Sequence, residues 1–566
     1  MVLVAAPLLA GAQTMYDALN YSQNNYSGSA RTIALGNAVT AVGGDLGTIG
    51  INPAGSATVG YSQFQITPNI AISRVGTNYS PWGETNYNAP YTINHKKMTM
   101  PNIGISMVFD TGNSSGLKSL TFAFVSNQTN NYLHYSDSYG YNSMSSKLAE
   151  FATAANGIDE ELLNRYSSYT DTDISWDILT AYQGGLIGSY GAGDYPYYIG
   201  NTEVLAQREG FHFHYVPGQL NQTSFITKEG SKNDIVLNMG LNFDDVLFIG
   251  GNIGLPTLDY RYSEQFFETA DNPEMFPISF EKGDTYFKGA EYAYDYAASA
   301  TGIYAKIGAI YRPTDDLRIG VAFQTPTALT IDETWQDYAR ATFADAYFDD
   351  NGVESPLGEY TYGLRTPYEV NAGIAYTIGG RGFISVDYEL TDFSVMKFKE
   401  FYDGNMFDDY EGSYYAVNET NKKFCGLQHQ LRAGAELKLL PQFALRAGYT
   451  LATSPERYWH DISGNVVTAD DFLAFYDDYH GTHGVYDPEY YKDRTTSYSL
   501  GFGYSSNGSF FADFAARLTQ YPESVYAPYY DYDGYNAQAE YMEMVAPRIK
   551  STRSLFDFAL TLGWRF

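Results

Sequence analysis

The chain has 566 residues and carries 65 acidic against 34 basic side chains, which gives a formal net charge of −31. We expect no nucleic-acid partner, because nucleic-acid binding needs a basic surface. The one cysteine, Cys425, excludes an internal disulfide. Aromatic residues make up 16% of the chain and charged residues only 17%, which does not suit the several soluble domains that the length alone suggests.

The first apolar run, Val2–Ala12, is too short to cross a bilayer as a helix. It ends in Ala10-Gly11-Ala12, the small-x-small pattern that signal peptidase cleaves. We therefore interpret residues 1–12 as a signal-peptide remnant and Gln13 as the first mature residue. A short buried helix is the alternative. No other stretch of the sequence is long and apolar enough for a membrane helix, so a membrane protein of this sequence must be a β-barrel.

Residues 13–57 are rich in glycine and alanine and have no clean helical or strand period; residues 26–55 read YSGSARTIALGNAVTAVGGDLGTIGINPAG. Small residues such as Gly36 let one backbone approach another closely. Non-helical backbone is tolerated at membrane depth only when protein or water encloses it. We expect this stretch to plug a barrel lumen, with Arg31 anchoring the plug to a lumen acid.

From residue 58 onward, strict alternation of apolar and polar residues indicates β-strands. Near the C-terminus, one face carries Phe556, Phe558, Leu560, Leu562, Trp564 and Phe566. An outer-membrane barrel turns such a face to lipid and the polar face to its lumen. The pattern predicts 14 strands, near residues 59–76, 98–110, 117–135, 223–242, 246–262, 299–312, 316–333, 366–378, 382–398, 427–440, 442–454, 494–506, 509–522 and 552–566.

The links between these strands alternate between short turns and long loops, as in outer-membrane barrels, whose short turns are periplasmic. The longest loop, 136–222, contains candidate helices near 143–155 and 159–166 and could fold over the barrel mouth. We predict an all-β membrane protein, a 14-stranded antiparallel outer-membrane β-barrel over residues 58–566 with an N-terminal hatch inside its lumen. Its expected location is the bacterial outer membrane.

The glycine-rich stretch, with Asn52-Pro53-Ala54 just before the first strand, resembles the hatch of FadL-type outer-membrane transporters of long-chain fatty acids and other hydrophobic compounds. AKIGAIYRPTDDLRIGVAFQTP (305–326) and LRAGAELKLLPQFALRAGYTLATSPE (431–456) also look similar to that family. The resemblance implies capture of an amphipathic ligand by the outer loops and passage to a lumen pocket. The hatch then shifts, and the ligand leaves sideways through the wall. It implies gating roles for Arg31, Gly36, Asn52, Pro53 and Ala54.

The third predicted strand turns Leu120, Phe122 and Phe124 outward, but the same face continues with Ser126, Gln128 and Asn130. Polar side chains that face lipid are costly. Residues 126–131 therefore lie either above the membrane, which we favour, or at a lateral opening in the wall.

Several cations should point into the lumen, and Lys306, Arg318 and Arg446 are candidates for holding a ligand carboxylate. The alternative is that each pairs with a lumen acid, such as Asp387, Glu389, Asp513 or Asp557. His212 and His214 share a strand face, and His460, His480 and His483 share a loop, but neither set includes a fixed third ligand, so no metal site is predicted. Residues 44–47 lack the G-K-[ST] of a phosphate loop. The acidic loop residues match no EF-hand and suit a solvated surface; they are Asp470, Asp471, Asp477, Asp478, Asp531, Asp533 and Glu540.

The sequence favours passive uptake of a hydrophobic or amphipathic small molecule, with no enzymatic activity and no cofactor. The expected partners are this ligand, the outer-membrane lipids and, through the C-terminal strand, the barrel assembly machinery; we expect a monomer. Two alternatives remain: a general porin, and an adhesin or assembly partner that uses the barrel as an anchor for its long loops.

Overall fold

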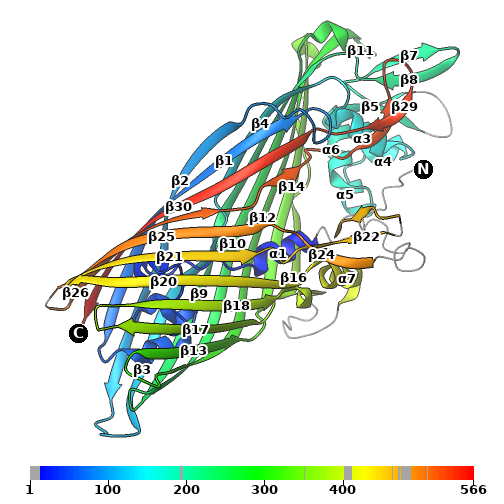
Figure 1. Cartoon of the computed structure of the whole chain (residues 1–566). Coiled ribbons are helices and arrows are strands. Elements are labelled where there is room, and N and C mark those ends of the chain that lie inside the picture. The colour runs from blue at the N-terminus through cyan, green and yellow to red at the C-terminus, as the bar shows by residue number, and fades with distance from the viewer. Residues whose placement is uncertain are drawn as a thin grey trace.

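The computed structural model describes residues 13–190, 196–349, 351–400, 411–461, 463–469, 472, 486–506 and 508–566. The predicted signal remnant, His480, His483 and four of the loop acids (Asp470, Asp471, Asp477 and Asp478) lie outside these ranges. In the described chain, 14 strands close one antiparallel barrel, because β30 pairs with β1 (Figure 1). In order around the wall they are β1 (Gln63–Ser80), β2 (Tyr91–Asp110), β3 (Leu117–Asn131), β9 (Leu220–Phe243), β10 (Leu247–Ala270), β12 (Gly283–Tyr311), β13 (Leu317–Gln324), β17 (Glu369–Ile378), β18 (Gly382–Asp392), β20 (Leu427–Leu440), β21 (Phe443–Thr453), β25 (Arg494–Ser505), β26 (Phe510–Gln520) and β30 (Arg548–Arg565).

The two faces of the wall are those that the alternation predicts. On β18, Ile384 and Val386 are exposed on the outside, while Ser385 and Asp387 are buried on the inside. Exposed apolar side chains continue around the end of the barrel that carries the short turns, which we call its lower part. They include Ile249, Ile307, Val321, Leu445, Leu500, Phe514, Phe558 and Leu560. This apolar belt over a closed wall of strands is the surface of a transmembrane barrel of the bacterial outer-membrane type.

Some predicted strand boundaries are wrong. The predicted strand 316–333 is two strands, β13 and β14 (Ala328–Phe343), which pair in succession with the same neighbour, β12. Pro326 separates them because proline has no N–H to give to the ladder. The predicted strand 382–398 likewise ends at Asp392, where a short 3₁₀ turn (Phe393–Val395) precedes β19 (Lys397–Glu400).

The wall is much taller on one side than on the other, as Figure 1 shows. β9, β10 and β12 have 24, 24 and 29 residues, whereas β13 and β17 have 8 and 10. Outward side chains of β12 are apolar at its lower end, as at Ile307, and polar higher up, as at Asp295. The upper half of the tall side therefore stands clear of the membrane.

The loop after β4 (His134–Asn142) folds into a cap that packs on the tall side. It contains α3 (Lys147–Ala155) and α4 (Glu160–Asn164), which confirm the two predicted helices, then α5 (Ser168–Asp171) and α6 (Trp176–Gln183). The fully buried Glu268 of β10 accepts hydrogen bonds from Ser146 Oγ (2.7 Å) and Lys147 N (3.2 Å), so a wall carboxylate caps α3.

The remaining elements are short. No described helix is long and apolar enough to cross a membrane. The short strands and helices are β5 (Ile187–Tyr190), β6 (Tyr197–Gly200), β7 (Val204–Arg208), β8 (Phe211–Tyr215), β11 (Pro277–Phe280), β15 (Val353–Glu354), β16 (Gly358–Arg365), α7 (Tyr415–Phe424), β22 (Arg457–His460), β23 (Val466–Val467), β24 (Tyr486–Tyr490), β27 (Ser524–Tyr526), β28 (Tyr532–Tyr535) and β29 (Tyr541–Met544), with 3₁₀ turns at Pro273–Met275, Ala346–Phe348 and Gly412–Tyr414.

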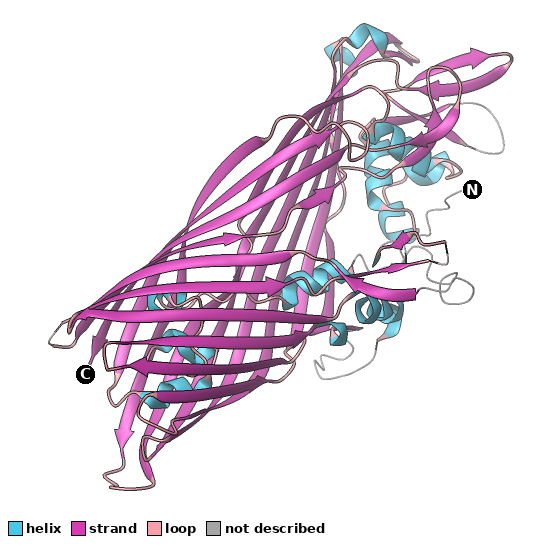
Figure 2. Ribbon diagram, viewed as in Figure 1, coloured by secondary structure: helices cyan, strands magenta, loops and turns pink. Residues whose placement is uncertain are grey.

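Residues 13–58, which we call the N-terminal segment, run inside the barrel as short helices and turns (Figure 2). They comprise α1 (Met15–Ser22), α2 (Ala30–Ala34), η1 (Leu46–Gly50) and η2 (Pro53–Thr58), and most of their side chains are buried.

Candidate functional site: a filled lumen and a break in the wall

Each short element of the N-terminal segment begins at a polar residue whose side chain caps it. Ser29 Oγ accepts from Thr32 N at 3.2 Å, and Asp45 Oδ1 accepts from Gly47 N at 2.9 Å. Asn52 Oδ1 accepts from Ala54 N at 3.0 Å, with Pro53 at the first position of the turn. Ser, Asp and Asn satisfy the free N–H groups of a helix start, so local chemistry explains why this segment forms brief turns without a long period.

The Asn-Pro-Ala tripeptide fastens the segment to the wall. Asn52 Nδ2 donates to Thr40 O within the segment (2.7 Å) and to Ala309 O of β12 (3.3 Å). Pro53 O accepts from Asn238 Nδ2 of β9 at 3.0 Å, and Ala54 is fully buried. The tripeptide is therefore a junction between the segment and two strands.

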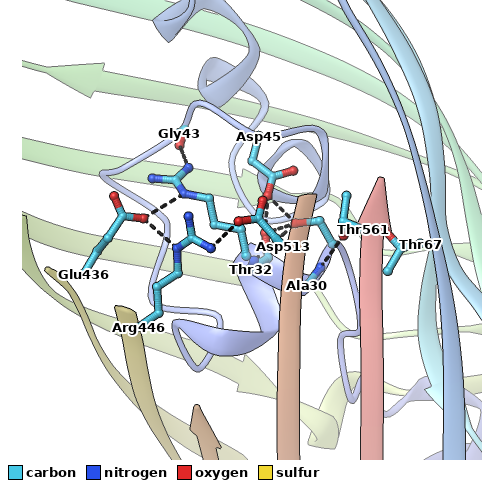
Figure 3. A network of polar contacts seen from close by, with 11 residues as sticks. Ala30, Thr32, Gly43, Asp45, Thr67, Glu436, Arg446, Asp513 and Thr561 are labelled. Carbon is cyan, nitrogen blue, oxygen red and sulfur yellow. Dashed lines mark hydrogen bonds and ion pairs between the residues drawn. The ribbon is translucent and has the colours of Figure 1, made fainter. Parts of the chain in front are cut away.

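Arg31 and Arg446 lie in one buried charge network (Figure 3). Glu436 Oε2 accepts from Arg31 Nε at 3.1 Å and from Arg446 Nε at 2.7 Å. Arg446 also pairs with Asp513. The network joins the segment to β20, β21 and β26, so Arg31 does contact a lumen acid.

The other two carboxylate-binding candidates also contact the N-terminal segment. Lys306 Nζ donates to Gly50 O at 2.9 Å and lies 3.5 Å from the Glu369 carboxylate. Arg318 Nη1 donates to Val42 O at 2.9 Å. Lys306 and Arg446 thus have the lumen-acid partners that the sequence left open as the alternative, and Arg318 has a backbone carbonyl partner.

Glycines of the wall let the segment fit closely, a feature that the sequence did not reveal. A Cβ atom at Gly250 would lie 2.3 Å from the carbonyl carbon of Pro53, and one at Gly448 would lie 2.1 Å from the amide nitrogen of Gly36. Gly36 itself has a φ of 60°, which glycine adopts at little cost. The wall glycines that meet the segment in this way are Gly240, Gly250, Gly308, Gly320, Gly373, Gly434, Gly448 and Gly501.

The wall has a break between β2 and β3. Their pairing runs from Asp110↔Ser119 to Asn102↔Asn127 and ends there, although both strands continue. Above that point β2 pairs with β1, and β3 pairs with β9. One edge of each strand therefore lacks its wall neighbour.

The N-terminal segment occupies the free edge of β3 in this break. Ser27 N donates to Gln128 O at 2.8 Å, and Asn25 N donates to Thr129 O at 2.6 Å. Because β9 holds one edge of β3, the antiparallel bridge between Ser27 and Gln128 must lie on the other. The segment therefore supplies β3 with hydrogen-bond partners that β2 does not supply at this point.

A chain of amide and carboxylate groups marks the lower end of the break. Gln65 Nε2 donates to Asp45 Oδ1 (3.0 Å) and Asn102 Oδ1 (2.6 Å). Asn102 Nδ2 donates to Asn127 Oδ1 at 2.7 Å. This chain links the segment to β1, β2 and β3 at the last paired residues.

Gln128 and Asn130 are only 4% and 7% exposed, so the expectation that they face outward is wrong. The strand is irregular between them, since its register with β9 shifts at this point. Ser126 is half-buried. Beside the break, Met98 and Met100 of β2 are 76% and 48% exposed, so the outer surface there is apolar.

Above the break, α1 fills the upper lumen. Its buried residues Met15, Ala18 and Leu19 pack against apolar side chains of the wall and of α7. Hydroxyl groups accompany them: Tyr21 Oη lies 2.8 Å from Tyr296 Oη, and Tyr296 Oη donates to Glu333 at 2.8 Å. The upper lumen is therefore an apolar compartment with a few polar groups.

The two histidines that the sequence places on one strand face, His212 and His214, both lie on β8. His214 Nδ1 lies 2.6 Å from Glu203 Oε1 in the cap, while His212 is exposed. Within the described ranges, no three His, Cys, Asp or Glu side chains are grouped as metal ligands.

No protein-family model matches the chain, and no curated protein matches it. Solved structures similar to it include a Pseudomonas aeruginosa FadL homologue, with 13% identity, 96% of this chain and 99% of that chain covered, and a TM-score of 0.46. The Ralstonia pickettii toluene transporter TbuX has 12% identity, 95% and 98% coverage and a TM-score of 0.42. The CymD monoaromatic hydrocarbon channel has 12% identity, 94% and 96% coverage and a TM-score of 0.41. The likeness to these barrels is one of fold.

Proposed function

We propose that the protein carries hydrophobic or amphipathic small molecules, such as long-chain fatty acids, passively across the outer membrane. The observation that carries the proposal is the break between β2 and β3, whose free strand edge is held by the N-terminal segment. A ligand enters from the outer loops, takes the place of α1 in the upper lumen and leaves sideways through this break when the segment moves.

The geometry gives each step a physical basis. The apolar side chains around α1, together with hydroxyls such as Tyr296, suit a ligand with an apolar body and a polar group. Two backbone hydrogen bonds from Asn25 and Ser27 close the break, and small shifts of the segment would release them. Outside, the apolar surface at Met98 and Met100 receives the ligand into the bilayer.

A disulfide across the closed break tests the proposal. In a Cys425→Ser background, Ser27→Cys with Gln128→Cys would join the segment to β3. Oxidation should lower uptake of a labelled fatty acid by roughly tenfold or more, because the open state is no longer populated, and reduction should restore it. The matched control is Ser106→Cys with Ala123→Cys, a directly paired position of β2 and β3 below the break. Full uptake through the oxidised Ser27–Gln128 pair would rule out lateral exit.

Two further deletions separate the alternatives. Removal of residues 13–50 should make a plugged transporter leaky and abolish ligand uptake, whereas a general porin would keep its conductance. Trimming of residues 140–205 would abolish binding by an adhesin and leave small-ligand uptake in place.

A further inference from the structure

Two carboxylates lie at the start of α1 in the upper lumen. Glu333 of β14 is 3% exposed and accepts hydrogen bonds from the Gln13 side-chain amide and from Tyr296 Oη. Asp17 accepts from Thr14 N at 2.8 Å and from Thr14 Oγ1 at 2.9 Å. The two carboxylates are linked through adjacent residues, since Gln13 contacts Glu333 and Thr14 contacts Asp17. All the donors named here are neutral.

Neither carboxylate has a cationic partner in the described chain. All 34 lysine and arginine residues fall within the described ranges, and none comes within 4 Å of Glu333 or Asp17 as an ion pair. Lys228 acts on Asp17 only from a greater distance. An ionised carboxylate that is buried without a counter-ion is costly, so a cation that reached this site would be stabilised there.

The sequence supplies a cation at this place if the leader is removed. Cleavage after Ala10-Gly11-Ala12 turns the amide nitrogen of Gln13 into an α-ammonium. Gln13 is 4% exposed, its side chain holds Glu333, and the next residue donates to Asp17. The new charge therefore arises on the residue whose side chain contacts Glu333, directly before the residue that contacts Asp17.

We propose that the Glu333–Asp17 pair is a binding site for the α-ammonium of the mature N-terminus, so that leader removal completes the seating of α1 in the lumen. The step is hydrolysis of the Ala12–Gln13 peptide bond by signal peptidase: water adds, Ala12 leaves as a carboxylate and Gln13 keeps the amine, which is protonated at neutral pH. The proposal does not depend on what the barrel transports.

The first test is mass spectrometry of the N-terminal peptide from protein purified out of the outer membrane. The peptide should begin at Gln13 and carry a free α-amine. A different first residue, or an amine blocked by cyclisation of Gln13, would overturn the proposal, because no ammonium would then reach the site.

The second test measures protection of that amine. An acylating reagent at neutral pH should label the α-amine of the folded, detergent-solubilised protein roughly tenfold faster in Glu333→Gln than in wild type, since one partner of a buried pair is lost. The glutamine in Glu333→Gln keeps an oxygen that can accept from the Gln13 amide. The difference in labelling rate therefore reports the lost negative charge and not a lost hydrogen bond. Asp337→Asn, on the same strand and also buried, is the control and should label like wild type.

An inserted alanine before Gln13 gives an independent check. It moves the ammonium by about 3.8 Å and should remove most of the difference between wild type and Glu333→Gln. Equal labelling of wild type and Glu333→Gln in the chain without the insertion would overturn the proposal, whatever the stability of the variants.

Discussion

Arg446 links two buried acids to each other and, through Glu436, to Arg31 of the N-terminal segment. Arg446→Met would leave Asp513 without its ion-pair partner in a buried site. Loss of one partner of a buried pair costs about 3–5 kcal/mol, so we expect a lower unfolding temperature in detergent and a higher conductance in planar bilayers. Arg312→Met is the control: its partner Asp315 is fully exposed, and such surface pairs contribute about 1 kcal/mol or less. An unchanged conductance in Arg446→Met would show that the network does not hold the segment.

The Glu203–His214 pair makes the cap sensitive to pH. Burial lowers the pKa of His214, but the Glu203 carboxylate and its hydrogen bond outweigh burial and raise that pKa above 6.5. The stabilisation is therefore complete below pH 6.5 and is lost as pH rises through the raised pKa. Hydrogen exchange of residues 204–215, corrected for intrinsic rates, should speed up over that range. Glu203→Gln should remove this dependence, and His212→Gln should keep it.

Close contact between the wall strands and the N-terminal segment depends on glycines of the lumen face, and not on glycines of the outer face. At Gly250 a side chain would collide with Pro53, whereas at Gly251, the next residue of β10, a Cβ atom would lie 4.0 Å from Lys306 O. We expect Gly250→Val to displace the segment and raise conductance, while the barrel still forms and keeps its heat-dependent mobility on gels. Gly251→Val should behave like wild type in both measurements. If the Gly250→Val barrel conducts no more than wild type, the segment can shift to accommodate the side chain, and glycine is not required at this position.

For the whole molecule, a periodicity of two was enough to predict the strand number, both faces and the closed wall, because a lipid-facing outer side and a polar inner side impose it on every strand. The N-terminal segment could be predicted to lie in the lumen from its small residues. The polar run after Phe124 does not by itself predict the break. The sequence signal is Pro101 of β2, which has no N–H to donate and directly precedes Asn102, the last residue of β2 that pairs with β3. Whether β2 continues to pair with β3 beyond Asn102 depends on the register between the two strands. The partners of Lys306, Arg318 and Arg446 likewise depend on how the segment is threaded, which no local pattern encodes.

The tall side of the wall also decides how a ligand can arrive. About 20 residues of β12 stand above the apolar belt, and at about 3.4 Å per residue and a tilt of about 40° they raise the rim by roughly 50 Å. A molecule dissolved in the bilayer cannot pass over that height, so a direct route from the outer leaflet to the mouth is confined to the short side around β13 and β17. A ligand that comes to the mouth through water should show uptake kinetics that follow its free monomer concentration in the medium. A ligand that crosses the short rim should enter faster when the outer leaflet is loaded with the same compound.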